Sequence, residues 1–114
     1  TADLLTAPVV AGLTLAGATE AQLDAGRAYG RGIGLAFQIV DDLLDLEGDV
    51  KLLGKDVGMD AQRGKMTWPA VAGVEQAHQD ARQAVEDAAA AMEPFGVRGA
   101  FLTELARQTL TRSV

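Results

Sequence analysis

Residues 20–46 carry the longest helical pattern of this chain, and they restrict the possible folds more than any other segment. The segment opens with Thr19-Glu20-Ala21-Gln22, which has the form of a capping box: a hydroxyl side chain is followed three positions later by an amide side chain. Gly48 is placed to end the helix. A glycine inside a helix costs about 1 kcal/mol relative to alanine, so it indicates close contact with another helix or room for a ligand. The segment contains four: Gly26, Gly30, Gly32 and Gly34.

The remaining segments also favour helices over strands. Residues 2–17 are apolar and rich in alanine, and Pro8 predicts a start or a kink there. A further helix begins near Thr67, with Pro69 in its first turn. From residue 74 to residue 92, apolar side chains recur at steps of three and four, which is typical of an amphipathic helix.

Pro94 and Gly96 end that amphipathic helix, and a last helix follows. Its apolar positions are Phe101, Leu102, Leu105 and Leu110. Aromatic residues make up only 4% of the chain while hydrophobic residues reach 48%, which favours close-packed helices over a sheet. We predict an all-α fold in a single domain, and we expect the 114 residues to be part of a longer protein.

Charge and composition exclude several functional classes. The net charge of −6 opposes binding to a phosphate backbone, so we expect no nucleic-acid partner. Without cysteine there are no disulfides, thiolate metal sites or cysteine nucleophiles, which agrees with a cytoplasmic location. No apolar run approaches the roughly 18 to 20 residues needed to cross a bilayer, so we expect no stable membrane insertion.

An acidic cluster at the end of the long helical segment is the first sign of chemistry. Five carboxylates fall within nine positions, among leucines: Asp41, Asp42, Asp45, Glu47 and Asp49. At about 100° per residue, one stripe of the helix reads Gly34, Gln38, Asp41 and Asp45. We expect the acids to point into an enclosed space at the negative end of the helix dipole. There each would cost about 0.3 to 1 kcal/mol, in addition to their mutual repulsion.

A cation bound between the carboxylates would turn both the repulsion and the dipole penalty into favourable interactions. Hard oxygen ligands, no cysteine and a single histidine indicate Mg²⁺. A calcium-binding helix–loop–helix is excluded, because counting back from Gly48 places Leu43 in the first ligand position. The following segment, residues 47–66, is rich in glycine and basic residues, which would suit a diphosphate next to the metal. A solvated acidic face whose carboxylates pair with loop lysines is the alternative.

The motif FQIVDDLLD, followed by GD, LGK and GKMTWP, resembles the trans-isoprenyl diphosphate synthases, the family of the farnesyl and geranylgeranyl diphosphate synthases. The likeness covers essentially the whole chain. It implies that residues 1–114 are the C-terminal fragment of a single all-α prenyltransferase domain, in which helices surround a central cavity. It also implies a homodimer.

The resemblance assigns roles to particular residues. Asp41, Asp42 and Asp45 match the second aspartate-rich motif, which holds Mg²⁺, with Asp41 as a direct ligand and the others acting partly through water. Gln38 would lie beside the reacting allylic carbons, and Thr1 resembles the threonine of a Lys-Thr pair that binds substrate. The resemblance also gives roles to three later residues. Lys55 would bind the allylic diphosphate, and Lys65 would pair with a neighbouring phosphate or carboxylate. Asp60 would lie near the metal without binding it directly.

The implied reaction is chain elongation. Mg²⁺ assists ionisation of dimethylallyl, geranyl or farnesyl diphosphate, which releases diphosphate and leaves an allylic cation. The double bond of isopentenyl diphosphate attacks the cation, and loss of a proton yields a chain one isoprene unit longer, with geranylgeranyl or farnesyl diphosphate as the final product. The chain lacks the family's first aspartate-rich motif, so we expect this piece alone to be inactive. A noncatalytic helical regulatory subunit or scaffold is the second hypothesis. The third is a terpene enzyme that cyclises or joins prenyl diphosphates, although the spacing of FQ and the aspartates favours elongation.

Other polar residues have structural interpretations. Tyr29 and Trp68 are expected to pack in the core with a polar tip. Arg27 and Arg31 are expected to pair with Asp24 or with an adjacent helix. The remaining helix charges, which include Asp80, are interpreted as solvated.

Overall fold

The computed structural model describes residues 1–53 and 66–111, and no strand occurs within these two ranges. The predicted all-α class is therefore confirmed. The elements are α1 (Ala2–Leu15), α2 (Glu20–Leu53), α4 (Trp68–Ala72), α5 (Val74–Ala91), the 3₁₀ helix η1 (Glu93–Gly99) and α6 (Ala100–Thr111). None of the helices in the described ranges is both long and apolar enough to cross a membrane.

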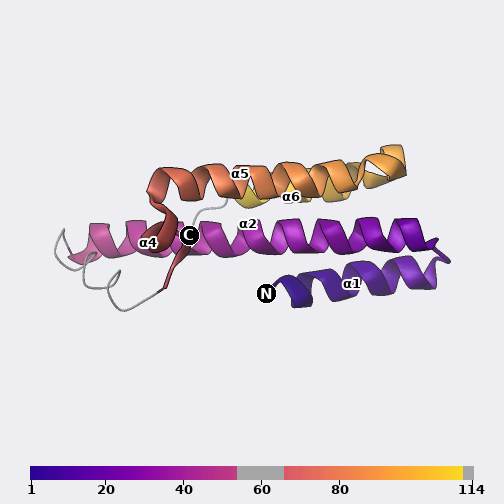
Figure 1. Ribbon diagram of the computed structural model, residues 1–114, viewed down its shortest axis with the longest axis horizontal. Coiled ribbons are helices and arrows are strands. Elements are labelled where there is room, and N and C mark those ends of the chain that lie inside the picture. Colours follow the sequence, from indigo (N-terminus) through magenta and orange to yellow (C-terminus); the bar gives the residue numbers. More distant parts are fainter. Residues whose placement is uncertain (54–65, 112–114) are drawn as a thin grey trace.

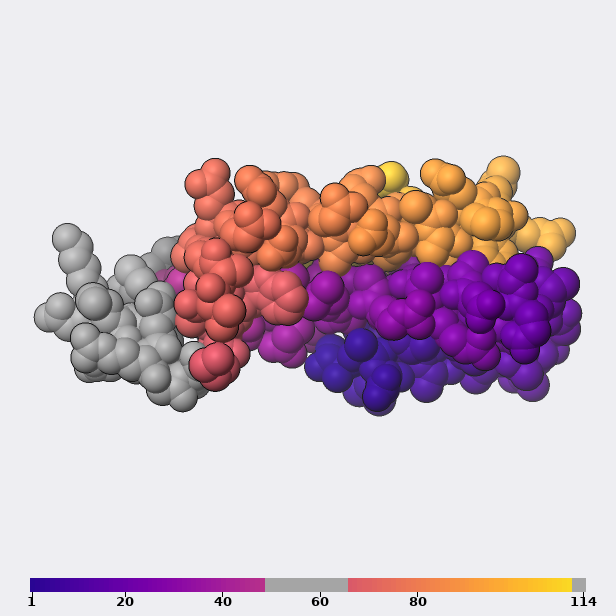
Figure 2. All heavy atoms as spheres, in the orientation of Figure 1, coloured from indigo at the N-terminus to yellow at the C-terminus, as the bar shows by residue number. Residues whose placement is uncertain are grey.

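Helix α2 is the axis of the molecule. Its 34 residues span about 51 Å at 1.5 Å per residue, close to the full 53 Å length of the protein. Helices α1 and α5 pack along different sides of α2, while α6 contacts both α5 and α2 (Figure 1). Figure 2 shows α5 extending over much more of α2 than α1 does; the indigo start of α1 stops well short of α4.

The start of α2 matches the prediction, but its end does not. The Thr19 N–H donates to Gln22 Oε1 at 2.9 Å and the Gln22 N–H donates to Thr19 Oγ1 at 3.2 Å, which is a complete capping box. The helix then continues through Gly48 to Leu53, so the predicted stop at Gly48 is wrong. One interior glycine costs only about 1 kcal/mol, and the leucine, glutamate and lysine residues around it are strong helix formers.

The shorter elements begin and end at their local signals, except at Pro8. Helix α1 runs from Ala2 across Pro8, so the proline does not start it. Thr67 caps α4, since the Ala70 N–H donates to Thr67 Oγ1 at 3.3 Å. Gly73, with φ of 93°, then separates α4 from α5 in a conformation that favours glycine.

The core lies between α2 and α5 and forms two clusters. The first joins Tyr29, Ile33 and Ala36 of α2 to Ala84, Val85 and Ala88 of α5, to Met92 directly after α5, and to Ala106 of α6. The second joins Ile39, Val40 and Leu43 of α2 to Ala77 and Ala81 of α5. The Tyr29 hydroxyl donates to the Leu102 carbonyl at 2.8 Å, and burial raises the pKa of this phenol. Tyr29 is thus the core aromatic with a polar tip that the sequence predicts.

The helical glycines mark close contacts between helices. A Cβ atom on Gly32 would lie 2.8 Å from the Ala84 carbonyl oxygen of α5. On Gly34 it would lie 2.5 Å from Ala2 Cα of α1, and Gly26 and Gly30 face α1 in the same way. Of the two explanations for these glycines, close helix packing is the one observed. Although α1 lies against this stripe, none of its residues is buried.

Candidate functional site

The acidic cluster lies on α2 beyond the part covered by α1. Asp41 and Asp42 are half-buried and Asp45 is exposed, so in the part of the chain that the structure describes the acids do not point into an enclosed space. Because α2 continues to Leu53, Asp45 lies about two turns before the helix end, and the dipole effect falls off within the last turn. The expected dipole penalty on these acids is therefore wrong. The carboxylates nevertheless lie close to one another on the surface of the helix.

Asp42 has both of its carboxylate oxygens engaged. Gln38 Nε2 donates to Asp42 Oδ1 at 3.0 Å, and the backbone N–H of Trp68 donates to Asp42 Oδ2 at 3.0 Å. The first bond orients the Gln38 amide one turn earlier on α2. The second bond joins α2 to the first residue of α4, so Asp42 connects two segments 26 residues apart in sequence.

A small cavity joins the two residues expected at the allylic substrate. Its volume is about 240 Å³, and its lining residues are Thr1, Ala2, Arg31, Gly34, Leu35 and Gln38. Thr1 and Gln38 thus meet on one surface although 37 positions separate them. Gly34 allows this approach because any side chain there would collide with the start of α1.

Arg31 is the residue of this cavity that sequence reasoning missed. Arg27 pairs with Asp24 at 2.7 Å and with Glu20 at 3.9 Å, as expected, but Arg31 forms no ion pair within the described ranges. Seven residues are 20° short of two helical turns, so Arg31 and Gln38 share a face of α2. That spacing is the signal that could have placed Arg31 beside Gln38.

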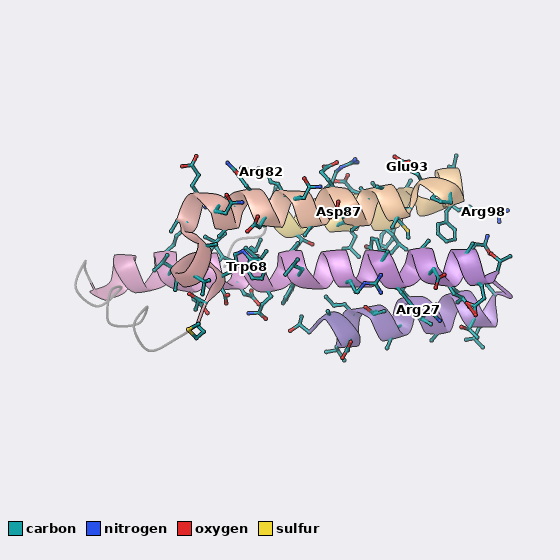
Figure 3. All side chains as sticks on the ribbon, in the orientation of Figure 1. Arg27, Trp68, Arg82, Asp87, Glu93 and Arg98 are labelled. Carbon is teal, nitrogen blue, oxygen red and sulfur yellow. The ribbon has the colours of Figure 1, made fainter. Side chains whose placement is uncertain are left out.

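Trp68 and Asp80 form a second connection, between α4 and α5. Trp68, which is labelled in Figure 3, is half-buried against the second core cluster. Its Nε1–H donates to Asp80 Oδ2 at 2.8 Å. Gln76 Nε2 donates to Asp80 Oδ1 at 2.8 Å. The interpretation of Asp80 as a solvated helix charge is therefore wrong, whereas Trp68 is the packed aromatic with a bonded polar tip that was predicted. These hydrogen bonds, that from Trp68 first, lower the pKa of Asp80.

We predict a pH-dependent signal from Trp68, the one tryptophan of the chain. The indole N–H resonance in a proton NMR titration should shift with a midpoint below the 3.8 of a free aspartate. Because the folded pKa is lowered, the stabilisation by this bond is present above the unfolded pKa and is lost as pH falls through the folded value. Asp80→Asn should remove the transition and Asp87→Asn should leave it. A midpoint at or above 3.8, or one that persists in Asp80→Asn, would contradict the assignment.

The predicted metal and phosphate ligands are only partly described by the structure. Lys55, Asp60 and Lys65 lie outside the described residues, and their roles stay predictions. Among the side chains that the structure describes, those of residues 1–48 and 66–111, no three His, Cys, Asp or Glu side chains are grouped so that they could hold a metal ion. The assignment of Asp41, Asp42 and Asp45 to Mg²⁺ likewise stays a prediction. Of these three, Asp42 is the one held from both sides by hydrogen bonds of known length.

Comparison with known proteins identifies the family. The polyprenyl synthetase model matches residues 1–95, and the chain belongs to this family. It is 37% identical over 113 residues to a dimethylallyltranstransferase of Fischerella ambigua (strain UTEX 1903), covering 99% of this chain and 33% of the relative. It is 43% identical over 89 residues to geranylgeranyl pyrophosphate synthase 11, chloroplastic, of Arabidopsis thaliana, covering 78% of this chain and 25% of the relative.

A third relative matches a shorter stretch more closely. It is the farnesyl diphosphate synthase of Escherichia coli (strain K12), 53% identical over 60 residues, which cover 53% of this chain and 20% of the relative. The chain spans a third or less of the length of these three relatives. The resemblance expected from the motif FQIVDDLLD is confirmed at the level of the family.

Proposed function

We propose that this chain is part of a chain-elongating prenyltransferase that condenses an allylic diphosphate with isopentenyl diphosphate. The names of the relatives, which include a dimethylallyltranstransferase and farnesyl and geranylgeranyl synthases, support this reaction class. The observation that carries the proposal is the arrangement on α2. Asp41 and Asp45 lie on a face that α1 leaves uncovered, about one and two turns from a Gln38 side chain already oriented by Asp42.

The donor set fits Mg²⁺ as half of a site. Mg²⁺ uses one or two carboxylates and completes its shell with water and phosphate oxygens, which matches the two carboxylates of Asp41 and Asp45 on adjacent turns. Asp42 would act through its neighbours, because both of its oxygens already accept hydrogen bonds. When bound, the ion supplies positive charge that stabilises the departing diphosphate.

The residues of this chain would orient the substrate around that charge. Gln38 donates through Nε2 to Asp42, so its carbonyl Oε1 is left to face a bound substrate, where a fixed dipole can stabilise charge developing on allylic carbons. Thr1 and Arg31 line the same cavity and would contact the substrate from the α1 side. Lys55 and Lys65 would bind the diphosphate oxygens.

The remaining features of the proposal concern the whole protein. The exposed face of α2 near Asp45 must be covered during the reaction, because water would trap an allylic cation. We propose that the rest of a longer chain supplies this cover and the other half of the metal site. A homodimer in the cytoplasm, with farnesyl or geranylgeranyl diphosphate as product, is the version that the family resemblance favours.

The direct test is product formation. The longer protein, incubated with Mg²⁺, isopentenyl diphosphate and dimethylallyl, geranyl or farnesyl diphosphate, should release a prenyl diphosphate longer by five carbons, detected by mass spectrometry. The 114-residue chain alone should release none, because it provides half of a metal site. Product from the short chain would contradict the second expectation.

The regulatory-subunit alternative makes a different prediction in the same assay. The longer protein alone would give no product with any allylic partner, but it would change the rate or product length of an added catalytic synthase. That outcome would overturn the proposed function.

A further inference from the structure

We infer that Trp68 and Asp80 are positioning residues of the site, which hold Asp42 and Gln38 in place from outside α2. The inference rests on the proposed function and extends it to two residues on α4 and α5. A continuous chain of hydrogen bonds connects them: Asp80 accepts from the Trp68 indole at 2.8 Å, the Trp68 backbone N–H donates to Asp42 at 3.0 Å, and Asp42 accepts from Gln38 at 3.0 Å.

Trp68 joins two acids through two different donors. Its side chain donates to Asp80 on α5 and its main chain donates to Asp42 on α2, so fixing the ring also fixes the N–H that Asp42 accepts. The ring is further held by packing against the second core cluster (Figure 3). Because Trp68 opens α4, its N–H has no partner within that helix, and Asp42 is the acceptor that satisfies it.

Asp80 is fixed in turn from its own helix. Gln76, one turn earlier on α5, donates to the second carboxylate oxygen at 2.8 Å. Both oxygens of Asp80 and both oxygens of Asp42 therefore have defined donors, and these bonds restrict the rotation of each carboxylate. Loss of the indole–Asp80 bond would free the ring, and through it the Asp42 carboxylate and the Gln38 amide.

The test uses two substitutions that each act on the bond between the indole and residue 80: one removes the donor and the other weakens the acceptor. Trp68→Phe keeps a ring but removes the indole N–H, and Asp80→Asn removes the charge of the acceptor. In the longer protein each should lower kcat by about tenfold, because misplacing a group that acts on the reacting carbons by about 1 Å can cost 10²-fold. The KM for isopentenyl diphosphate should stay within twofold.

A matched control and a double mutant separate positioning from general packing. Asp87 lies two turns further along α5, is exposed, and accepts from Gln83 at 2.9 Å just as Asp80 accepts from Gln76, but it has no bond to α4. Asp87→Asn should leave kcat unchanged. The double mutant of Trp68 and Asp80 should lose no more activity than Trp68→Phe alone, because both substitutions act on one interaction. Additive losses, or an equal loss in Asp87→Asn, would overturn the inference.

A second measurement keeps the inference testable if the proposed activity fails. Hydrogen exchange of the Trp68 backbone amide, followed by NMR in the same protein, should be about tenfold faster in Asp80→Asn than in the parent or in Asp87→Asn. If the parent makes no product but this exchange accelerates, the anchoring is correct and the proposed function is wrong. Unchanged exchange would overturn the anchoring, whatever the activity.

Discussion

Gly32→Ala should lower the free energy of unfolding by about 1 to 3 kcal/mol, although alanine is the better helix former. The new Cβ atom would lie 2.8 Å from the Ala84 carbonyl oxygen and 3.0 Å from the Ala88 Cβ atom, at the centre of the contact between α2 and α5. A backbone oxygen held inside a helix cannot move aside as the end of a flexible side chain can. The clash therefore outweighs the gain of about 1 kcal/mol in helix propensity. Urea unfolding followed by circular dichroism measures the difference.

Gly12→Ala is the matched control for this prediction. Gly12 also lies inside a helix, but a Cβ atom there would meet no other atom within 4 Å. This substitution should raise stability by up to about 1 kcal/mol, because only the propensity term changes. Equal effects at the two positions would mean that α2 and α5 do not pack as closely as described.

Asp41→Asn in the longer protein should lower kcat by about 10² to 10³, with little change in the fold. The substitution keeps the shape of the side chain and removes the charge that would hold the ion beside the departing diphosphate, an effect worth several kcal/mol in such sites. The Mg²⁺ concentration that gives half-maximal rate should rise as well. Steady-state kinetics at varied Mg²⁺ measures both quantities.

Asp24→Asn tests whether that loss is specific to the site. Asp24 lies on the same helix, is exposed, and pairs with Arg27 at 2.7 Å, far along α2 from Gln38. It should change kcat by less than twofold, since an exposed ion pair contributes little. Retention of most activity in Asp41→Asn would favour the solvated acidic face and count against the metal site.

Local signals were sufficient for most of the fold. The capping box at Thr19, the cap at Thr67 and the steps of three and four in α5 each act within one turn of helix, so the sequence displays them directly. The end of α2 does not follow from Gly48 alone, because two opposing helix propensities decide where the helix stops. One glycine penalty at Gly48 competes with the propensity of several flanking residues, and those residues prevail.

The site was less accessible to prediction where it depends on tertiary contacts. The motif around Asp41 and Gln38 is contiguous, so its presence on one helix face follows from helical geometry. The partners of Asp42 and Asp80 do not follow, because Trp68 reaches them from 26 and 12 positions away through the folding of α4 between α2 and α5. No pattern near Asp80 distinguishes it from Asp87, which has the same glutamine four residues earlier.

Because α2 is one unbroken helix, it fixes the spacing between the glycines that contact α1 and α5 and the aspartates of the acidic cluster. The glycines that seat α1 and α5 and the aspartates of the acidic cluster belong to one rigid helix, so their relative orientation is set by residue count alone. A single inserted or deleted residue between Gly34 and Asp41 would swing the carboxylates by about 100° while the glycine contacts stayed in place. A change of length in this interval should therefore misdirect the acidic cluster even if every side chain is kept.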